Sequence, residues 1–364
     1  MTRPIPGSAT PTGTRRFAAR FATGFAPDFY RPTSSGLTIS SIGMGTYLGE
    51  CDDEEDARYV KVLVAGAAHG LNVLDTAINY RCQRSERAVG RSLRQIIDSG
   101  SAAREELVVC TKGGYVPLEG SPPESRDEYE AYLDKEYFSP SIMSKADLVA
   151  GGHCMRPGFL SNQIARSREN LGVECIDVFY LHNPEQQLDS IDRKTFTTLM
   201  RDAFAELESQ VAAGHIGSYG CATWNGFRVS PAARNHLSLS EMVEAAKSAG
   251  GKSHHFRFVQ LPVNLAMTEA VRATTQTLDD ASFSLLDLAP QVDVSVVASA
   301  SLMQSQLTRN LPPGVQALFP DLDTDAQRAI AFVRSLPVAA ALVGMRSSAH
   351  LMENIAAGSA VIRA

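Results

Sequence analysis

Short apolar runs and amphipathic segments alternate along most of this chain. Eight runs have the length of buried strands, at 42–46, 71–74, 107–110, 176–181, 217–221, 256–261, 292–298 and 339–343. Segments with helical patterns follow them, at 52–69, 85–97, 161–171, 193–213, 239–249, after Thr268, from Thr324, and up to about Ala357. This alternation predicts a parallel sheet with helices packed outside it.

The number of strand and helix units favours a closed barrel. Eight units predict a (β/α)8 TIM barrel, with an open doubly wound sheet as the alternative. No G-x-G-x-x-G motif lies between a strand and a helix, so a Rossmann-type nucleotide site is not indicated. Two intervals, 112–160 after the third strand and 299–323 after the seventh, are longer than ordinary connections. We expect both long loops at the active rim, as walls of a pocket.

The first 33 residues differ from the rest in composition. They are rich in Pro, Gly, Ser and Thr and contain five arginines but a single acid, Asp28. Such a composition predicts a disordered tail over residues 1–33, with an organelle transit peptide as the alternative. The barrel domain is then expected over residues 34–364.

Composition and charge narrow the class of protein. Of the 364 residues, 44% are hydrophobic and 20% charged, and the formal net charge of −6 gives no reason to expect nucleic acid as a partner. No run approaches the roughly 20 apolar residues of a membrane helix. The six cysteines form no C-x-x-C pair, which is typical of reduced thiols in a cytoplasmic protein without a zinc site or disulfide framework.

Polar residues follow three successive predicted strands. Asp75 and Tyr80 come after the second strand, Lys112 after the third and His182 after the fourth. Each residue alone would more often be a surface or core residue than a catalyst. In a barrel, however, the carboxyl ends of all strands meet at one rim, which is where barrel enzymes hold their active sites. The four together therefore indicate a catalytic site.

These four groups suit the reduction of a carbonyl. Hydride attack on the carbon leaves negative charge on the oxygen, which needs a proton donor. Tyr80 can reach it, but a free phenol with a pKa near 10 is a weak acid at neutral pH. We expect the Lys112 ammonium to lower that pKa, Asp75 to hold Lys112, and His182 to donate a hydrogen bond that orients the carbonyl.

Several stretches resemble the aldo-keto reductase superfamily. They are DTAINY at 75–80, SE at 85–86, VVCTKG at 108–113, YLHN at 180–183, GHIGSYG at 214–220, VQLPVN at 259–264 and VGMRSSAHLMEN at 343–354. The resemblance implies that the four polar residues are the Tyr-Lys-His-Asp tetrad of that superfamily. It also implies a nicotinamide cofactor at the top of the barrel, normally NADP(H), with NAD(H) possible.

At the positions that contact the nicotinamide in the family, this chain matches some residues and differs at others. Where the family has a Ser-Asn pair after the fifth strand, this chain has Ala222 and Thr223, with Asn225 two residues later. Gln260 matches the usual glutamine after the sixth strand. Ser299 stands where an aromatic residue usually stacks on the nicotinamide ring.

The last motif matches the end of the site that binds adenosine. The resemblance implies that Arg346, Ser347, His350 and Asn354 hold this part of the cofactor, with a 2′-phosphate near the basic side chains. An arginine suits a phosphate because its guanidinium can donate two parallel hydrogen bonds.

The sequence therefore predicts an NAD(P)H-dependent oxidoreductase that interconverts an aldehyde or ketone and an alcohol, with a small-molecule substrate as its partner. It specifies neither that substrate nor an oligomeric state. One alternative is a cofactor-binding barrel without turnover, acting as a sensor or regulatory subunit. Another is an aldolase in which Lys112 forms a Schiff base, although Asp75 would favour the charged lysine over the neutral amine that this chemistry needs.

Overall fold

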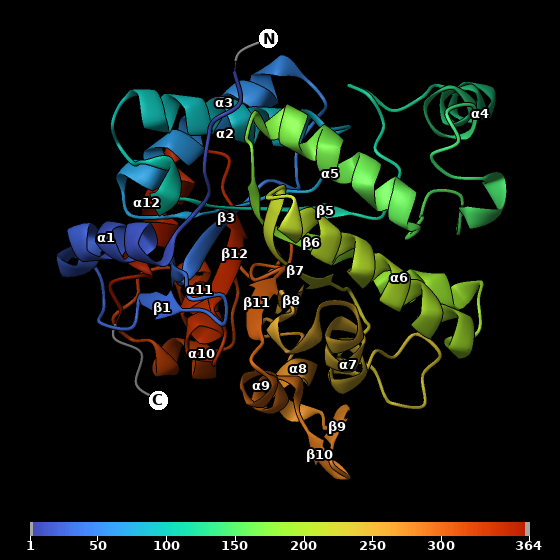
Figure 1. Cartoon of the computed structure of the whole chain (residues 1–364). Helices are drawn as coiled ribbons and strands as arrows, with labels where there is room; N and C mark the ends of the chain where they lie inside the picture. The colour runs from blue at the N-terminus through green and yellow to red at the C-terminus, as the bar shows by residue number, and fades with distance from the viewer. Residues whose placement is uncertain (1–2, 361–364) are drawn as a thin grey trace.

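A closed barrel of eight parallel strands forms the centre of the computed structural model, which describes residues 3–360 (Figure 1). Its strands are β3 (Ile42–Gly45), β4 (Val73–Asp75), β5 (Val108–Gly113), β6 (Ile176–His182), β7 (Ile216–Ala222), β8 (Phe256–Pro262), β11 (Ser295–Ser299) and β12 (Ala340–Gly344). β11 pairs with β8 and β12 with β3, which closes the ring. The predicted TIM barrel is confirmed, and each predicted strand overlaps an observed one.

Helices surround this barrel, as Figure 1 shows. They are α2 (Asp53–Ala68), α3 (Arg84–Asp98), α5 (Pro157–Leu171), α6 (Arg193–Ala212), α7 (Leu239–Gly250), α8 (Glu269–Arg272), α9 (Leu285–Leu288), α11 (Asp325–Arg334) and α12 (Ser348–Ala356). Further elements lie outside this pattern, namely α1 (Pro11–Phe21), α4 (Arg126–Leu133), α10 (Pro313–Leu318), β1 (Tyr30–Pro32), β2 (Thr38–Ser40), β9 (Gln276–Leu278) and β10 (Ala281–Phe283). Side-chain caps define several starts: Asp52 accepts from the Glu55 amide before α2 and Asp192 from the Thr195 amide before α6.

Shorter helical turns complete the chain. They are η1 (Ala22–Gly24), η2 (Arg104–Glu106), the π-helix η3 (Asp134–Phe138), η4 (Lys145–Asp147), η5 (Pro184–Asp189), η6 (Gly251–Ser253) and η7 (Ala289–Val292).

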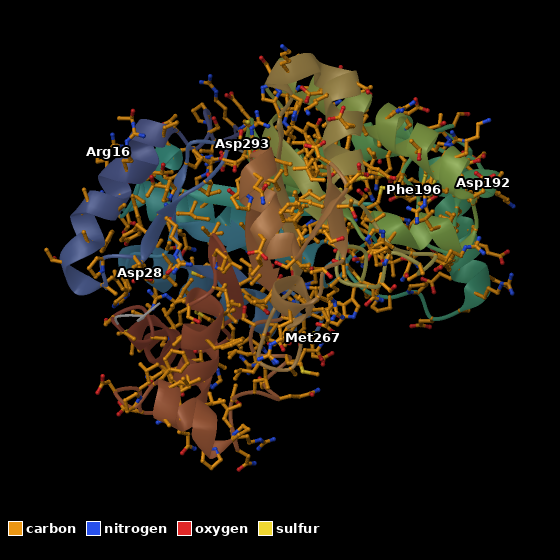
Figure 2. All side chains as sticks on the ribbon, turned by 90° about the horizontal axis from the view of Figure 1, so that it is seen from below. Arg16, Asp28, Asp192, Phe196, Met267 and Asp293 are labelled. Carbon is orange, nitrogen blue, oxygen red and sulfur yellow. The ribbon has the colours of Figure 1, made fainter. Side chains whose placement is uncertain are left out.

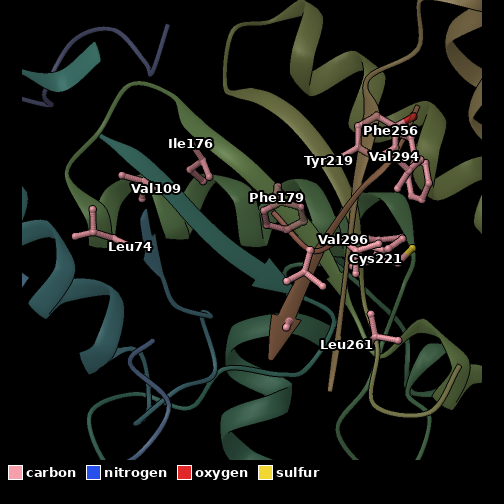
Figure 3. Packing of buried hydrophobic residues seen from close by; sticks show 14 of the residues in the cluster. Leu74, Val109, Ile176, Phe179, Tyr219, Cys221, Phe256, Leu261, Val294 and Val296 are labelled. Atoms are coloured by element: carbon pink, nitrogen blue, oxygen red, sulfur yellow. The ribbon is translucent and has the colours of Figure 1, made fainter. Parts of the chain in front are cut away.

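The barrel strands are buried on both faces. Leu74, Val109 and Phe179 belong to the large core between strands and helices, part of which Figure 3 shows. Their neighbours Val73 and Val108 belong to a second cluster, which fills the barrel interior. Because side chains alternate between the two faces of a strand, the interior positions recur every second residue. This alternation also fixes which polar residues at the strand ends point inward.

The first 33 residues are not the disordered tail that their composition predicts. They include α1, whose first residue Pro11 follows a Thr10 cap, and β1, which pairs antiparallel with β2. The tail prediction is therefore wrong for residues 3–33. Residues 1–2 and 361–364, which belong to the predicted tail and barrel ranges, lie outside the described part of the chain.

Buried aromatic rings and ion pairs explain why this segment folds. Phe17 and Phe29 are fully buried, and the ring of Phe29 stacks on that of Phe25 with 3.8 Å between the centroids. Arg16, which Figure 2 shows on α1 at the outer edge of the molecule, pairs with Glu106 at 2.9 Å. The arginines thus bind acids of the barrel domain instead of keeping the segment extended in water.

The long loop after β5 is folded rather than open. It contains α4 and η3, and its own small hydrophobic cluster includes Leu133, Tyr137 and Phe159. Figure 1 shows α4 projecting beyond α5, away from the barrel. None of the helices within residues 3–360 has the length and apolarity needed to cross a membrane.

Candidate active site

The inward register of three neighbouring strands brings the predicted polar residues together. Asp75 follows interior Val73 by two positions, and Lys112 and His182 follow interior Cys110 and Tyr180 in the same way. Tyr80 comes from the loop after β4. The rings of Tyr80 and His182 lie 5.8 Å apart between centroids, in an edge-to-face arrangement. The four residues thus share one rim of the barrel, as expected.

A buried ion pair lies at the base of this site. The Lys112 Nζ donates to Asp75 Oδ1 at 2.5 Å and to the carbonyl of Thr76 at 2.8 Å. Gln260 donates to the other Asp75 oxygen at 2.9 Å. Burial lowers the pKa of Lys112, but the charges of Asp75 and Tyr80 raise it by more, so the net pKa lies above its ordinary value. Lys112 is therefore an ammonium ion.

Tyr80 lies directly above this ammonium. The Lys112 Nζ is 5.0 Å from the centroid of the Tyr80 ring, and the ring of Tyr47 packs edge-to-face against Tyr80 with 5.0 Å between the centroids. Burial raises the pKa of the Tyr80 phenol, Lys112 lowers it, and Asp75 raises it again. The pKa lies above its ordinary value, so the expectation of a net lowering is wrong. Lys112 acts in the expected direction, but the cost of burying a phenolate is larger.

His182 is a neutral imidazole with an unused ring nitrogen. Burial lowers its pKa well below the ordinary value, and Lys112 and His153 lower it further. Its Nδ1 is buried and has no hydrogen-bond partner within the described residues. The ring of Tyr115 lies edge-on at 5.0 Å between centroids. The imidazole also lines the cavity above the site, where it can contact a group that enters.

A cavity of about 660 Å³ opens above these residues. The strand ends contribute Asp75, His182, Ala222, Gln260 and Ser299 to its lining, and the loops contribute Tyr47, Asn79, Tyr80, Tyr115, Asn183, Thr223 and Trp224. Residues 300–306 form one wall of the cavity, so the loop after β11 lies where the sequence predicted it. The loop after β5 supplies Tyr115 near its start. A cavity of this size can hold a small organic molecule.

Two exposed aromatic side chains mark the mouth of the cavity. Tyr47 is 56% exposed and Trp224 is 46% exposed, although both line the cavity. Tyr47 had no signal in the sequence because no motif surrounds it. Exposed aromatic rings beside a pocket are suited to contact a ligand.

The residues predicted to hold the nicotinamide separate into two groups. Thr223, Gln260 and Ser299 line the cavity, and the buried Oγ1 of Thr223 has no partner among the described residues. Asn225 lies outside the lining, and its backbone N–H donates to Glu185 at 3.0 Å.

Glu185 has a structural role that no sequence motif indicates. Its Oε1 accepts from the backbone N–H groups of Trp224, Asn225 and Gly226 at 2.9, 3.0 and 3.2 Å. Burial raises the pKa of this carboxyl, and those three donors oppose the rise. The carboxylate therefore fixes the loop after β7 from behind. A lone glutamate after a strand gives no sequence signal for such a contact.

The residues predicted at the adenosine end lie outside the cavity. Arg346 forms a bidentate ion pair with Glu55, with both distances at 2.5 Å. Ser347 caps α12 by accepting from the His350 amide at 3.2 Å. The His350 side chain is exposed, whereas Asn354 is buried in the same helix.

His153 is a buried residue of the long loop after β5. Gln187 donates to its Nδ1 at 2.7 Å, so its Nε2 carries the proton and donates to the His182 carbonyl at 2.8 Å. Within residues 3–360, no three His, Cys, Asp or Glu side chains gather in a way that could hold a metal ion. His153 thus fastens the loop after β5 to the backbone of His182.

Comparison with known sequences agrees with this geometry. The model of the aldo/keto reductase family matches residues 41–311. The D-threo-aldose 1-dehydrogenase of Pseudomonas sp is 28% identical over 194 residues, which are 51% of this chain and 51% of that protein. The NADH-specific methylglyoxal reductase of Escherichia coli (strain K12) is 24% identical over 215 residues, which are 57% of this chain and 55% of that protein. The chain thus spans little more than half the length of these curated relatives.

Solved structures share the fold. An aldo/keto reductase from Klebsiella pneumoniae, in complex with NADP and acetate, has a TM-score of 0.60 and 19% identity and covers 92% of this chain and 91% of its own. The holo form of an aldo-keto reductase from Bacillus halodurans has a TM-score of 0.61 and 17% identity, with 92% of both chains covered. At these identities the likeness shows the barrel fold.

Proposed function

The chain belongs to the aldo/keto reductase family, and we propose that it is an NAD(P)H-dependent oxidoreductase that interconverts an aldehyde or ketone and an alcohol. One observation carries the proposal: Tyr80 and His182 face one cavity above the buried Lys112–Asp75 pair. This arrangement holds a proton donor, a charge that stabilises its conjugate base, and a polar group that can orient a carbonyl.

The lining of the cavity fits a nicotinamide cofactor. The buried Thr223 hydroxyl without a partner, the Gln260 amide and the Ser299 hydroxyl could bind a carboxamide group. The solved structure from Klebsiella pneumoniae was described with NADP. Bound NAD(P)H would supply the hydride. We propose that Arg346, Ser347, His350 and Asn354 lie toward the adenosine end, and that Asn225 supports the loop after β7 rather than the ring itself.

In this proposal Tyr80 gives its proton to the carbonyl oxygen. Because burial raises its pKa, the phenol is protonated at neutral pH and so available as an acid. After the transfer, the phenolate lies beside the Lys112 ammonium, which stabilises the new negative charge. Asp75 keeps that ammonium in place through the 2.5 Å contact. The reverse reaction uses the same groups, with Tyr80 as the base.

His182 positions the substrate in the same proposal. Its pKa is far below the ordinary value, so it is a neutral imidazole over the physiological range. A neutral imidazole can donate one N–H to the carbonyl oxygen without competing with Tyr80 as an acid. The edge-on ring of Tyr115 restricts its rotation.

The cavity walls favour an uncharged, hydroxylated substrate. Asp75 is the only formally charged residue in the described lining, and Lys112 already pairs with it. A substrate carboxylate would therefore find no cation, whereas amides and hydroxyls from Asn79, Asn183 and Ser301 can bind hydroxyl groups. Two curated relatives are named for an aldose and for methylglyoxal. We propose small neutral sugars and related uncharged carbonyl compounds as the substrate class.

We also propose that the protein is located in the cytoplasm. All six cysteines are free thiols, which supports the cytoplasm as the location because disulfides do not persist there.

Titration and turnover together test the function. Quenching of protein fluorescence by NADH and NADPH measures binding, and cofactor absorbance during incubation with neutral aldoses, methylglyoxal and simple aldehydes measures turnover. We expect tight binding of at least one cofactor and oxidation of it by a member of the panel. Binding without turnover on any carbonyl or alcohol would instead support a sensor. Borohydride trapping of substrate on Lys112 would support the aldolase, although the raised pKa of Lys112 opposes that chemistry.

A further inference from the structure

Two thiols face each other beside Tyr80. Cys51 lies in the loop between β3 and α2, and Cys82 lies in the turn between β4 and α3, two residues after Tyr80. Their sulfur atoms are 3.8 Å apart. Cys82 is buried, whereas Cys51 is half-buried and so within reach of a small reagent in solution. Neither thiol has a role in the proposed reductase reaction.

Arg81 holds these two segments in register. Its Nε donates to the carbonyl of Glu50 at 2.7 Å and its Nη2 to the carbonyl of Asp52 at 3.2 Å, which are the residues on either side of Cys51. The same Nη2 pairs with Asp56 at 2.6 Å. Since Arg81 precedes Cys82 directly, one buried guanidinium fixes the backbone next to both sulfurs.

The turn around Cys82 is fixed on its other side too. Arg81, Cys82 and Gln83 have φ values of 50°, 53° and 70°, a left-handed run that non-glycine residues adopt only when their surroundings require it. The Gln83 amide donates to the carbonyl of Leu118 at 3.0 Å. The backbone around Cys82 is therefore held by contacts that do not involve Cys51.

We propose that Cys51 and Cys82 form an oxidisable dithiol, which closes to a disulfide when the protein meets hydrogen peroxide. A disulfide has a sulfur–sulfur length of about 2.05 Å, so the two atoms must approach by about 1.8 Å. Rotation of two side chains with a small backbone shift can supply such a movement. The other four cysteines are buried and serve as internal controls.

The reaction proceeds in two displacements. The Cys51 thiolate attacks one peroxide oxygen and the O–O bond breaks. Cys51 becomes a sulfenic acid, and the hydroxide that departs is protonated to the first water. The sulfur of Cys82 then attacks the Cys51 sulfur, the S–O bond breaks, and a second water leaves. Two thiols and one peroxide thus give one disulfide and two waters. Burial, with Cys51 and Glu119, raises the pKa of Cys82 to about 12, which assigns the first step to Cys51.

The bond would change the catalytic wall of the cavity. The loop of Cys51 also contains Tyr47, and the turn of Cys82 follows Tyr80; these two rings lie 5.0 Å apart and line the cavity. Drawing the two segments together displaces the proposed acid from its place above Lys112. Because misplacement by about 1 Å can cost about a hundredfold in rate, we expect turnover to fall at least about tenfold. This consequence rests on the proposed reductase function.

Peptide mapping under non-reducing conditions tests the bond itself. The full-length protein is treated with hydrogen peroxide, free thiols are alkylated, and a proteolytic digest is analysed by mass spectrometry. We expect a cross-linked peptide pair that contains Cys51 and Cys82 and that separates on reduction. The Cys175→Ser variant should form the same bond, whereas the Cys51→Ser and Cys82→Ser variants should not.

The possible results test the dithiol and the proposed reductase function independently. If peroxide takes Cys51 to a sulfinic acid, or links it elsewhere, while Cys82 stays a free thiol, the dithiol is refuted. If the bond forms but wild type and Cys51→Ser lose turnover equally, the effect on the catalytic wall is refuted. If no carbonyl is turned over, the proposed function fails, yet the peptide map still decides the disulfide.

Discussion

Arg346 donates from Nε and from Nη2 to the two oxygens of Glu55, with both distances at 2.5 Å. The Glu55 side chain is 2% exposed and that of Arg346 is 41% exposed. The guanidinium that the resemblance assigns to a 2′-phosphate is thus already paired with a buried carboxylate. A phosphate would have to replace this partner or share the guanidinium with it, which costs binding energy.

We expect Glu55→Gln to favour NADPH. The amide is isosteric but uncharged, so the positive charge of Arg346 is no longer neutralised by Glu55 and can attract a phosphate. The dissociation constant for NADPH should fall by about tenfold, which corresponds to about 1.4 kcal/mol, while that for NADH changes little. Fluorescence titration with each cofactor measures both constants without turnover.

Glu54→Gln is the matched control for that change. Glu54 lies on the same turn and pairs with Arg58, but it does not contact Arg346. It removes the same charge, so equal shifts for the two variants would mean that only net charge matters and would refute the specific pairing.

Tyr80→Phe should remove turnover and keep cofactor binding. The change deletes the proposed proton donor and leaves the ring that contacts Tyr47 and Lys112. General acid catalysis contributes about a hundredfold to ten-thousandfold, so we expect turnover to fall within that range. Stopped-flow measurement of cofactor oxidation gives the rate, and the titration described above gives the binding constant.

Tyr47→Phe provides the control for the phenol. Tyr47 lines the same cavity and packs on Tyr80, but it is 56% exposed, and the ring that lies over the Lys112 ammonium is that of Tyr80. Its turnover should stay within about tenfold of wild type. A loss as large as that of Tyr80→Phe would mean that the proton donor has been misassigned.

The shared rim of Asp75, Lys112 and His182 was predictable because strand periodicity is strict. Each of Asp75, Lys112 and His182 follows an interior residue by two positions, and the carboxyl ends of parallel strands share one rim. The positions of three strands were therefore enough to predict that these side chains lie together. The net pKa of Tyr80 was not predictable, since it depends on how deeply the phenol is buried against Lys112.

Contacts between distant segments were not predictable in this way. The pairing of Arg346 with Glu55 joins residues 291 apart, and motif spacing contains no information about it. The folded N-terminal segment did carry a signal, because Phe17, Phe21, Phe25 and Phe29 recur every four residues. The overall composition still predicted disorder, because polar residues are far more abundant in this segment than the four phenylalanines whose rings are buried on folding.

Breaking the ion pair at the base of the site should cost stability. In Lys112→Met the Asp75 carboxylate remains buried with Gln260 as its donor. Loss of one partner of a buried pair costs about 3–5 kcal/mol, so the free energy of unfolding in urea should fall by that amount. The double variant Asp75→Asn, Lys112→Met should recover much of the loss. If the two single losses simply add in the double variant, the two side chains do not act as a pair.

His153 should make the protein less stable in mild acid. Burial lowers its pKa to about 4, below the value near 6.5 of an unfolded chain. The unfolded state therefore binds the proton first, so this contribution to stability is complete above about pH 6.5 and is lost as the pH falls toward 4. Between pH 7 and pH 5 the loss should be roughly 2 kcal/mol. The free energy of unfolding is measured in urea at pH 7 and at pH 5. Its fall between the two pH values should be smaller in His153→Gln than in wild type, by the amount given above. In the exposed control His350→Gln the fall should equal that of wild type. Equal drops in both variants and wild type would mean that another group senses the acid.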